Sequence, residues 1–245
     1  MTEKNYTRDE YIYLAKLYER AERFSEMVSH IISYVKLDSK LTIEERNILS
    51  AGFKNVISSK RASWRLMNSE EKKEEKKESK NLSYTREIKN RIEDEMREIC
   101  DSIQSTLDNY LIPNSKDHEN KVFYLKLKGD YYRYRGEFSV GKEFEESVNN
   151  AEKAYKNAYE IAENHIPIHN SIRLGLALNF SVFYYEIKIL KEEACQIAKN
   201  AFEEAIKIVD DLERNKAKDT LLIIQLLKEN LILWNNDNNE EESDN

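Results

Sequence analysis

The sequence predicts an all-α protein built from about nine antiparallel helices. Its 245 residues include only five glycines and two prolines, while 35% of the residues are charged and 40% are hydrophobic. Sheet proteins of this length need many tight turns, and tight turns depend on glycine, proline and asparagine. Apolar residues also recur at spacings of three and four along most of the chain, which is the period of an amphipathic α-helix. We therefore expect long helices with short connections, packed as an antiparallel array.

Helix-start signals place the helices of the N-terminal half. Thr7 is a suitable N-cap for a first helix, and a second helix follows near Ser25. Thr42 and Glu45 have the S/T-x-x-E spacing of a capping box, which predicts the start of a long helix. Residues 70–80 carry no apolar side chain, so we expect a solvated helix end or a loop there.

Apolar stripes and prolines place the remaining helices. A regular stripe runs from Ile88 to Leu107, and Pro113 ends it. Pro167 separates two later helical stretches. Further helices are expected over about 121–138, 142–164, 171–187, 194–205 and 221–234. Residues 1–234 are thus predicted to form one helical domain, and the acidic stretch 235–245 is predicted to be a disordered tail.

Signatures of enzymes, metal sites and membrane spans are missing from the sequence. The glycines form neither a G-x-G-x-x-G motif nor a P-loop, and there is no H-E-x-x-H motif. His165 and His169 are four residues apart, but Pro167 between them disrupts a helical ligand pair. We therefore expect no catalytic activity, cofactor or metal. The net charge of −7 does not favour binding to nucleic acid or to an acidic membrane. The N-terminus has no apolar signal-like segment, so we expect a cytoplasmic protein with reduced cysteines.

Two basic islands stand out in this acidic chain. Lys54 and Arg61 are seven residues apart, which places them on one helix face two turns apart. Lys126 and Arg133 repeat this spacing on a different helix, and Tyr134 adds a hydroxyl group. Two such helices facing each other across a groove would suit a phosphate dianion, because guanidinium groups bind phosphate oxygens in pairs and lysine adds a point charge. The alternative is a set of ordinary surface bases whose stems cover apolar neighbours.

Two asparagines interrupt apolar helix faces. Asn179 lies between Leu178 and Val182, and Asn230 follows Leu226 by one turn. An amide is unfavourable on such a face unless it has a hydrogen-bond partner. Because it carries both a donor and an acceptor, it could hold the backbone of an extended peptide. The alternative is an amide that is satisfied locally or by water.

Long blocks of the sequence match a known family pattern. The four longest are RNILSAGFKNVISSKRASWR at 46–65, KVFYLKLKGDYYRY at 121–134, RLGLALNFSVFYYEI at 173–187 and LLIIQLLKENLILW at 221–234. Shorter blocks are AERFSEM at 21–27 and NYLIPN at 109–114. Together they closely resemble the signature blocks of the 14-3-3 family. The resemblance covers nearly the whole chain and is weak only at 66–86, at 139–170 and in the tail.

This resemblance implies a dimer of all-helical subunits, each with a concave amphipathic groove for phosphoserine or phosphothreonine peptides. The positions that match the family's phosphate-binding residues are Lys54, Arg61, Arg133 and Tyr134. The positions that match its peptide-contacting residues are Lys126, Leu178, Asn179, Val182, Glu186, Leu222, Ile223, Leu226, Asn230, Leu233 and Trp234. The implied function is that of a non-catalytic adaptor, which regulates client proteins in signalling by masking, clamping or bridging them.

The resemblance also implies dimer contacts made through the N-terminal helices. Arg23 with Glu95, and Glu26 with Arg91, match two ion pairs between subunits. Ser63 matches an interface serine whose phosphorylation separates the dimers of some members, because a phosphate brings about two negative charges into a packed interface. The partner subunit is expected to be an identical copy or a paralogue.

Several residues depart from the family pattern near the expected site. Lys60 stands where an arginine is usual, and Arg135 with Gly136 replaces a leucine–alanine pair, which adds a cation. Residues 168–171 and Thr220 also differ from the usual pattern. These departures leave the client preference open.

The expected partners are phosphorylated client proteins, with no nucleic acid and no membrane insertion. Clients could also carry the protein into the nucleus. A second hypothesis is a helical-repeat scaffold that binds unphosphorylated acidic or hydrophobic peptides. A third, a helical enzyme with a carboxylate-bound metal, would need paired E-x-x-H spacing, which the sequence lacks.

Overall fold

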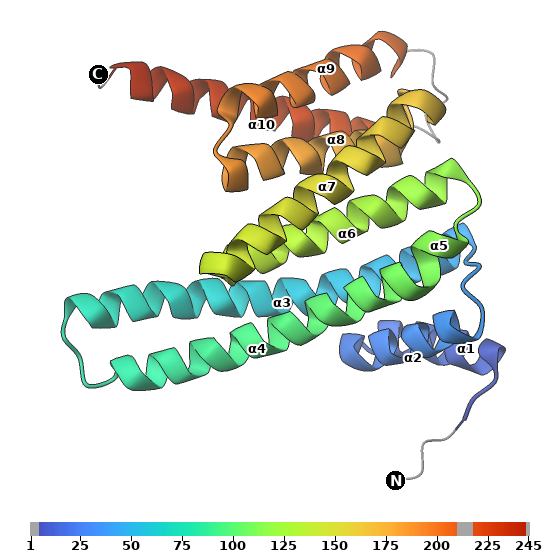
Figure 1. The fold of residues 1–245 in the computed structure, drawn as a ribbon, viewed down its shortest axis with the longest axis horizontal. Helices are drawn as coiled ribbons and strands as arrows, with labels where there is room; N and C mark the ends of the chain where they lie inside the picture. The colour runs from blue at the N-terminus through green and yellow to red at the C-terminus, as the bar shows by residue number, and fades with distance from the viewer. Residues whose placement is uncertain (1–4, 210–217, 244–245) are drawn as a thin grey trace. The chain divides into compact units, whose positions relative to one another are not determined.

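A computed structural model describes residues 5–209 and 218–243 of the chain (Figure 1). In these ranges the regular structure is helical and no strand occurs. Nine of the α-helices have 13 or more residues, which confirms the predicted all-α class and the number of helices. The contacts divide the chain into two compact units, Met1–Asn114 and Ser115–Asn245, and each is described by itself.

The first unit is a sequence of helices that pack on their neighbours in the chain. Helix α1 contacts α2, α2 contacts α3, and α3 runs along α4. The elements are α1 (Arg8–Arg20), α2 (Phe24–Leu37), α3 (Ile43–Lys76), α4 (Leu82–Thr106), the π-helix η1 (Leu107–Leu111) and α5 (Ile112–Asn114). The helix end predicted at Pro113 is confirmed, because α5 ends one residue after it.

Two capping boxes fix the starts of helices α1 and α3. They confirm the predicted N-cap at Thr7 and the predicted capping box at Thr42. The Thr7 hydroxyl accepts the backbone N–H of Glu10, and the Glu10 carboxylate accepts the N–H of Thr7. Thr42 and Glu45 make the same reciprocal pair at the start of α3. The Glu45 carboxylate also accepts the hydroxyl of Tyr34, so this cap ties α3 to α2. Such caps satisfy backbone donors that a helix leaves unpaired at its first turn.

The core of the first unit is apolar and closely packed. The side chains that are almost fully buried are Met27, Ile31, Leu49, Phe53, Ile57, Met96, Ile103 and Leu107. Gly52 allows α2 to lie close to α3, because a Cβ atom there would be 3.2 Å from Val28 Cγ2 and 3.3 Å from Met27 Sδ. This contact sets which face of α3 is turned away from the core.

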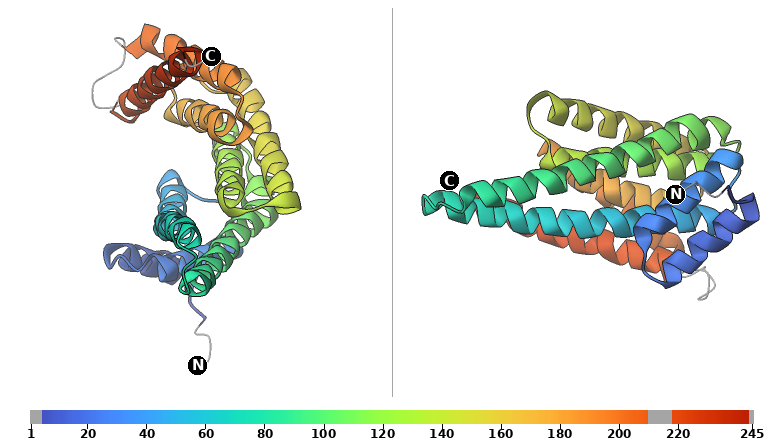
Figure 2. Two further views of the ribbon diagram at one scale, coloured as in Figure 1. Left: turned by 90° about the vertical axis from the view of Figure 1, so that its left-hand side faces the viewer. Right: turned by 90° about the horizontal axis from the view of Figure 1, so that it is seen from below.

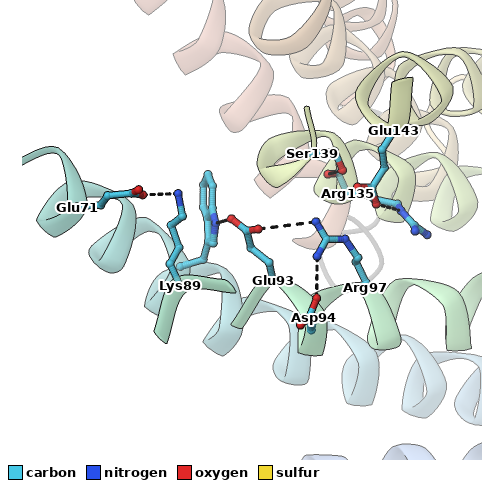
Figure 3. A network of polar contacts seen from close by, with 9 residues as sticks. Glu71, Lys89, Glu93, Asp94, Arg97, Arg135, Ser139 and Glu143 are labelled. Atoms are coloured by element: carbon cyan, nitrogen blue, oxygen red, sulfur yellow. Dashed lines mark hydrogen bonds and ion pairs between the residues drawn. The ribbon is translucent and has the colours of Figure 1, made fainter. Parts of the chain in front are cut away.

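The charged run 70–80 lies at the end of a long helical hairpin. Helix α3 continues to Lys76, so a helix end is confirmed there, and α4 begins at Leu82 (Figure 2). The charges, however, are not simply solvated. Glu71 is only 13% exposed, accepts Arg86 Nε at 2.8 Å and pairs with Lys89, as Figure 3 shows for Lys89. The ion pairs therefore hold the two arms of the hairpin together beyond its apolar part.

The second unit contains the five remaining long helices. Helices α6 and α7 lie side by side, and α8 contacts α6, α7, α9 and α10. The elements are α6 (His118–Phe138), α7 (Gly141–His165), α8 (Ser171–Phe183), the π-helix η2 (Tyr184–Lys188), α9 (Lys191–Val209) and α10 (Lys218–Ser243). Because α10 extends to Ser243, it includes most of the stretch predicted as a tail. The domain boundary at residue 234 stays a prediction.

The turn after η2 has an unusual backbone conformation. Ile189 has a φ of 55°, in the left-handed region, and its side chain is 66% exposed. This region is unfavourable for a β-branched residue, because Cβ approaches the carbonyl oxygen that follows it. The preceding π-helix and the start of α9 hold the residue there.

Candidate functional site

Helix α3 carries the first pair of predicted phosphate-binding residues. Phe53 and Ile57 are fully buried, and this fixes the rotation of the helix so that Lys54 is exposed. Arg61 is half-buried and lies about 10 Å further along the helix axis. The neighbouring Lys60 is ion-paired with Glu95 of α4, so its charge is balanced within the first unit.

The predicted dimer residues also lie in the first unit, where they contact groups of their own chain. Arg23 pairs with Glu26, and the hydrogen bond from Arg23 lowers the pKa of the Glu26 carboxyl. Arg91 Nη2 lies 3.4 Å from Glu87 Oε1. Ser63 is exposed, and its hydroxyl donates to the carbonyl oxygen of Ser59 at 3.1 Å. The ion pairs between subunits, and the interface role of Ser63, stay predictions.

Helix α6 carries the second basic pair, in the second unit. Lys126 and Arg133 are both present on the side of α6 that contains Asp130. Arg133 is 8% exposed, and its Cζ atom lies 4.8 Å from the centroid of the Tyr134 ring. An arginine that is almost buried keeps its charge, so it needs polar neighbours inside the unit.

Those neighbours converge on the carboxylate of Asp130. Lys126 Nζ donates to Asp130 Oδ2 at 2.7 Å, and the Tyr155 hydroxyl donates to Oδ1 at 2.5 Å. Asn179 Nδ2 of α8 donates to the same Oδ1 at 2.8 Å. Arg133 Nε lies 3.4 Å from the Tyr155 hydroxyl oxygen and donates to it. The second unit thus brings Lys126, Arg133 and Asn179 together around one buried carboxylate.

The protonation states in this cluster follow from burial and charge. Burial acts to raise the pKa of Asp130, but Lys126 and Arg133 outweigh it and hold that pKa below its usual value. Burial raises the pKa of Tyr155 well above its usual value, and the adjacent Asp130 charge adds to this effect. At neutral pH Asp130 is therefore ionised and Tyr155 keeps its proton.

Helices α8 and α10 supply the predicted peptide-contacting residues. A Cβ atom at Gly175 would lie 3.7 Å from Lys126 Cε and 3.9 Å from Ile223 Cδ1, so α6, α8 and α10 meet at this glycine. Leu222, Leu226 and Leu233 are exposed although they are apolar.

The other predicted groove residues differ in their burial. Leu178, Val182 and Asn230 are half-buried, and Glu186 is exposed. Trp234 is buried, and its ring stacks on Tyr185 at a centroid distance of 4.5 Å. Trp234 of α10 therefore packs against the π-helix η2 through Tyr185.

The extra cation expected at Arg135 is balanced. Arg135 Nε lies 3.0 Å from Glu143 Oε1 of α7, and the Ser139 hydroxyl donates to the Arg135 carbonyl oxygen at 2.7 Å (Figure 3). Arg135 does add a cation next to Tyr134, and its charge is paired with Glu143 of α7 within the second unit.

Neither a metal cluster nor a membrane span is found in the part of the chain that the structure describes. No three His, Cys, Asp or Glu side chains of residues 5–209 and 218–243 are grouped so that they could hold a metal ion. Over the same ranges, no helix combines the length and the hydrophobicity that crossing a bilayer requires.

Comparison with known proteins decides the family. The model of the 14-3-3 protein family matches residues 14–235. The chain belongs to the 14-3-3 protein family. It is 49% identical over 235 residues to the 14-3-3-like protein GF14 epsilon of Arabidopsis thaliana, covering 96% of this chain and 92% of that protein. It is 48% identical over 224 residues to a 14-3-3 protein homolog of Trichoderma harzianum, covering 91% of this chain and 86% of that protein.

Two residues at the centre of the α6 cluster were missed by the sequence reasoning. Asp130 is the only acid in the basic stretch 121–136 of this 14-3-3 chain, and its position between Lys126 and Arg133 was a usable signal. Tyr155 carried no such signal, because it is one of fifteen tyrosines and lies on another helix.

Proposed function

We propose that this 14-3-3 protein is a non-catalytic adaptor that binds phosphoserine and phosphothreonine motifs in client proteins. The observation that carries the proposal is the cluster on α6, in which a nearly buried Arg133 is held by the Tyr155 hydroxyl and lies over Tyr134. A guanidinium group restrained in this way loses little side-chain entropy when it binds a planar pair of oxygens. The residues proposed to bind the phosphate are Lys54, Arg61, Arg133 and Tyr134.

The charge of the cluster favours an anion of this size. Lys126 and Arg133 are positive, and Asp130 offsets one of these charges, so an excess positive charge remains in a site that is partly removed from water. Hydrogen bonds between charged groups are worth about 1.5–3 kcal/mol each. A phosphate group can accept several of them at once.

The amides and the exposed leucines are proposed to bind the peptide on either side of the phosphate. Asn179 and Asn230 would hold the peptide backbone, since each amide offers a donor and an acceptor. Leu222, Leu226 and Leu233 are exposed in the chain by itself, and contact with the side chains of a client would remove their apolar surface from water. The full set of proposed peptide-contacting residues is the one that the sequence indicates.

The proposed adaptor acts as a dimer formed through its N-terminal helices. Two binding sites on one dimer would raise the affinity for a client with two motifs by about 10²–10⁴. Such a dimer could mask, clamp or bridge its clients, in the cytoplasm and, with a client, in the nucleus.

The proposal is tested with a fluorescein-labelled phosphoserine peptide and its unphosphorylated counterpart in an anisotropy titration. We expect Lys54→Glu to weaken binding of the phosphorylated peptide at least about 10-fold, because it removes a charge-assisted contact and adds repulsion. Lys72→Glu is the matched control, since Lys72 is an exposed lysine on the same helix, about 27 Å from Lys54 along the axis.

Two outcomes would contradict the proposal. Equal affinities for the phosphorylated and unphosphorylated peptides would favour the helical-repeat scaffold instead. Equal losses of phosphopeptide affinity in Lys54→Glu and Lys72→Glu would show that the total charge of the protein, and not a site at Lys54, controls binding.

A further inference from the structure

Asp130 is an unexpected residue at a site for anions. It is 4% exposed and lies within hydrogen-bond distance of groups from three helices, namely Lys126 of its own α6, Tyr155 of α7 and Asn179 of α8. A buried carboxylate repels a phosphate group, so its presence lowers the affinity that the bases alone would provide. The contacts of Asp130 indicate that this charge orients two neighbouring side chains, Asn179 and Arg133.

The first contribution concerns the orientation of the Asn179 amide. An ionised carboxylate only accepts hydrogen bonds, so the group that lies 2.8 Å from Asp130 Oδ1 has to be the NH₂ end of the amide. The nitrogen and oxygen of an amide are bonded to the same trigonal carbon atom, so they point in different directions. The carbonyl oxygen of Asn179 is therefore directed away from Asp130, on a side chain that is only half-buried.

The second contribution concerns Arg133. The Tyr155 hydroxyl donates a hydrogen bond to Asp130, so its oxygen can accept one from Arg133 Nε. The hydrogen bonds therefore run in one direction, from Arg133 through Tyr155 to Asp130. The Tyr155 ring is fully buried and packs on Phe180 and Phe183 at centroid distances of 5.4 and 5.5 Å. The Tyr155 hydroxyl that contacts Arg133 is thus fixed by the packing of its ring and by its hydrogen bond to Asp130.

We propose that Asp130 is a positioning residue of the peptide site, which fixes Asn179 with its carbonyl oxygen outward to accept a backbone N–H of the bound peptide, and which restrains Arg133 through Tyr155. This inference rests on the proposed function. Lys126 balances the charge of Asp130, which limits the repulsion of the phosphate group.

The orientation of Asn179 is tested with ester-containing peptides. In each peptide one backbone N–H, within two residues of the phosphoserine, is replaced by an ester oxygen, which cannot donate. We expect one of these peptides to bind the unaltered protein about 2- to 10-fold more weakly than the all-amide peptide, the range of one neutral hydrogen bond. The same replacement should have no effect on the variant Asn179→Ala.

Asp130→Asn then tests the role of the carboxylate. The ammonium group of Lys126 favours the oxygen of the new amide, which turns its NH₂ group toward Asn179 and reverses the Asn179 amide. We expect the ratio of amide to ester affinities to fall to about one in this variant. An unchanged ratio would overturn the inference.

A spectroscopic measurement keeps the inference testable if Asp130→Asn folds poorly. In ¹⁵N-labelled protein, the Asn179 side-chain NH₂ signal is identified by its loss in Asn179→Ala. We expect one of its protons to exchange slowly with water, both before and after the phosphopeptide binds. Fast exchange in the unaltered protein would mean that the NH₂ end does not face Asp130.

Tyr155→Phe and Tyr159→Phe form a matched pair for the contact with Arg133. Both tyrosines are on α7 and both rings contact Phe180, but only Tyr155 hydrogen-bonds to Asp130. We expect Tyr155→Phe to weaken phosphopeptide binding several-fold with the amide-to-ester ratio unchanged, and Tyr159→Phe to leave both unchanged. Equal effects of the two variants would refute the restraint of Arg133. Failure of the unaltered protein to prefer the phosphorylated peptide would refute the proposed function itself.

Discussion

A glycine on α6 offers a direct test of how tightly Tyr155 is held. A Cβ atom at Gly129 would lie 2.8 Å from Cδ1 and Cε1 of Tyr155 and 2.9 Å from its Cζ. Carbon atoms in contact are normally about 3.5–4 Å apart, so the variant Gly129→Ala forces the Tyr155 ring to move by about 0.7 Å or more. The ring has little room to move, because it is fully buried and its hydroxyl donates a hydrogen bond to Asp130.

The size of the effect can be worked out from opposing contributions. Overpacking of a well-packed core costs about 1–3 kcal/mol. A weakened hydrogen bond to Asp130 adds about 1 kcal/mol to this destabilisation. In the opposite direction, the higher helix propensity of alanine stabilises the helix by about 1 kcal/mol relative to glycine. We therefore expect Gly129→Ala to lower the free energy of unfolding by about 1–3 kcal/mol and to weaken phosphopeptide binding through Arg133.

Gly136 on the same helix is the matched control. A Cβ atom there would meet only Phe144, at 4.0 Å, which is ordinary contact. Gly136→Ala should therefore raise the free energy of unfolding by about 0.5–1 kcal/mol. Urea unfolding followed by circular dichroism measures both variants. Equal stabilities of the two would show that Tyr155 moves freely and would refute the close packing on which the estimate depends.

Two further predictions concern other parts of the chain. Ile189→Asn should raise the unfolding midpoint by about 2–4 °C, because about 1 kcal/mol of backbone strain is relieved while the lost side chain is largely exposed; an unchanged midpoint in thermal unfolding would contradict this. Glu71→Gln should cost about 1 kcal/mol at pH 7, and more than Glu75→Gln, because Glu75 is the more exposed partner of Arg86. Lys89 and Arg86 lower the pKa of Glu71 in the folded state. The stabilisation by ionised Glu71 is therefore fully present above the unfolded pKa of about 4.3, and it is lost as the pH falls through the lower folded pKa. In urea unfolding from pH 7 to pH 3, the difference in the free energy of unfolding between wild type and Glu71→Gln should therefore shrink on the acid side. A constant difference would contradict this role of the ionised Glu71.

Local signals predicted the helices well. The capping boxes at Thr7 and Thr42 are short-range patterns whose physics is contained in four residues, so the sequence shows them directly. The charged stretch near Glu71 was harder to interpret, because its partners Arg86 and Lys89 lie on the next helix. Pairing across a hairpin depends on tertiary packing, which the helical period does not contain.

The same limit applies to the candidate site. Lys126 and Arg133 were found from their spacing on one helix, and Asn179 from its place on an apolar face. The contact that joins them runs through Asp130 and Tyr155, which are 25 residues apart. The place of Asp130 between two bases was visible in the sequence, but its donors Tyr155 and Asn179 lie on other helices and are known only from the tertiary structure.

The reliance of the hairpin on charge implies a gradient of local stability along α3 and α4. Toward the turn, Leu66, Tyr84 and Ile88 are exposed, and ion pairs such as that of Arg86 with Glu75, each 49% exposed, replace the apolar contacts that hold the other end. Salt screens exposed charges but hardly affects buried apolar surface. In the chain by itself, the backbone amides of the hairpin should therefore exchange with solvent fastest next to the turn, and added salt should speed exchange there first while the amides beside Phe53 and Met96 stay protected.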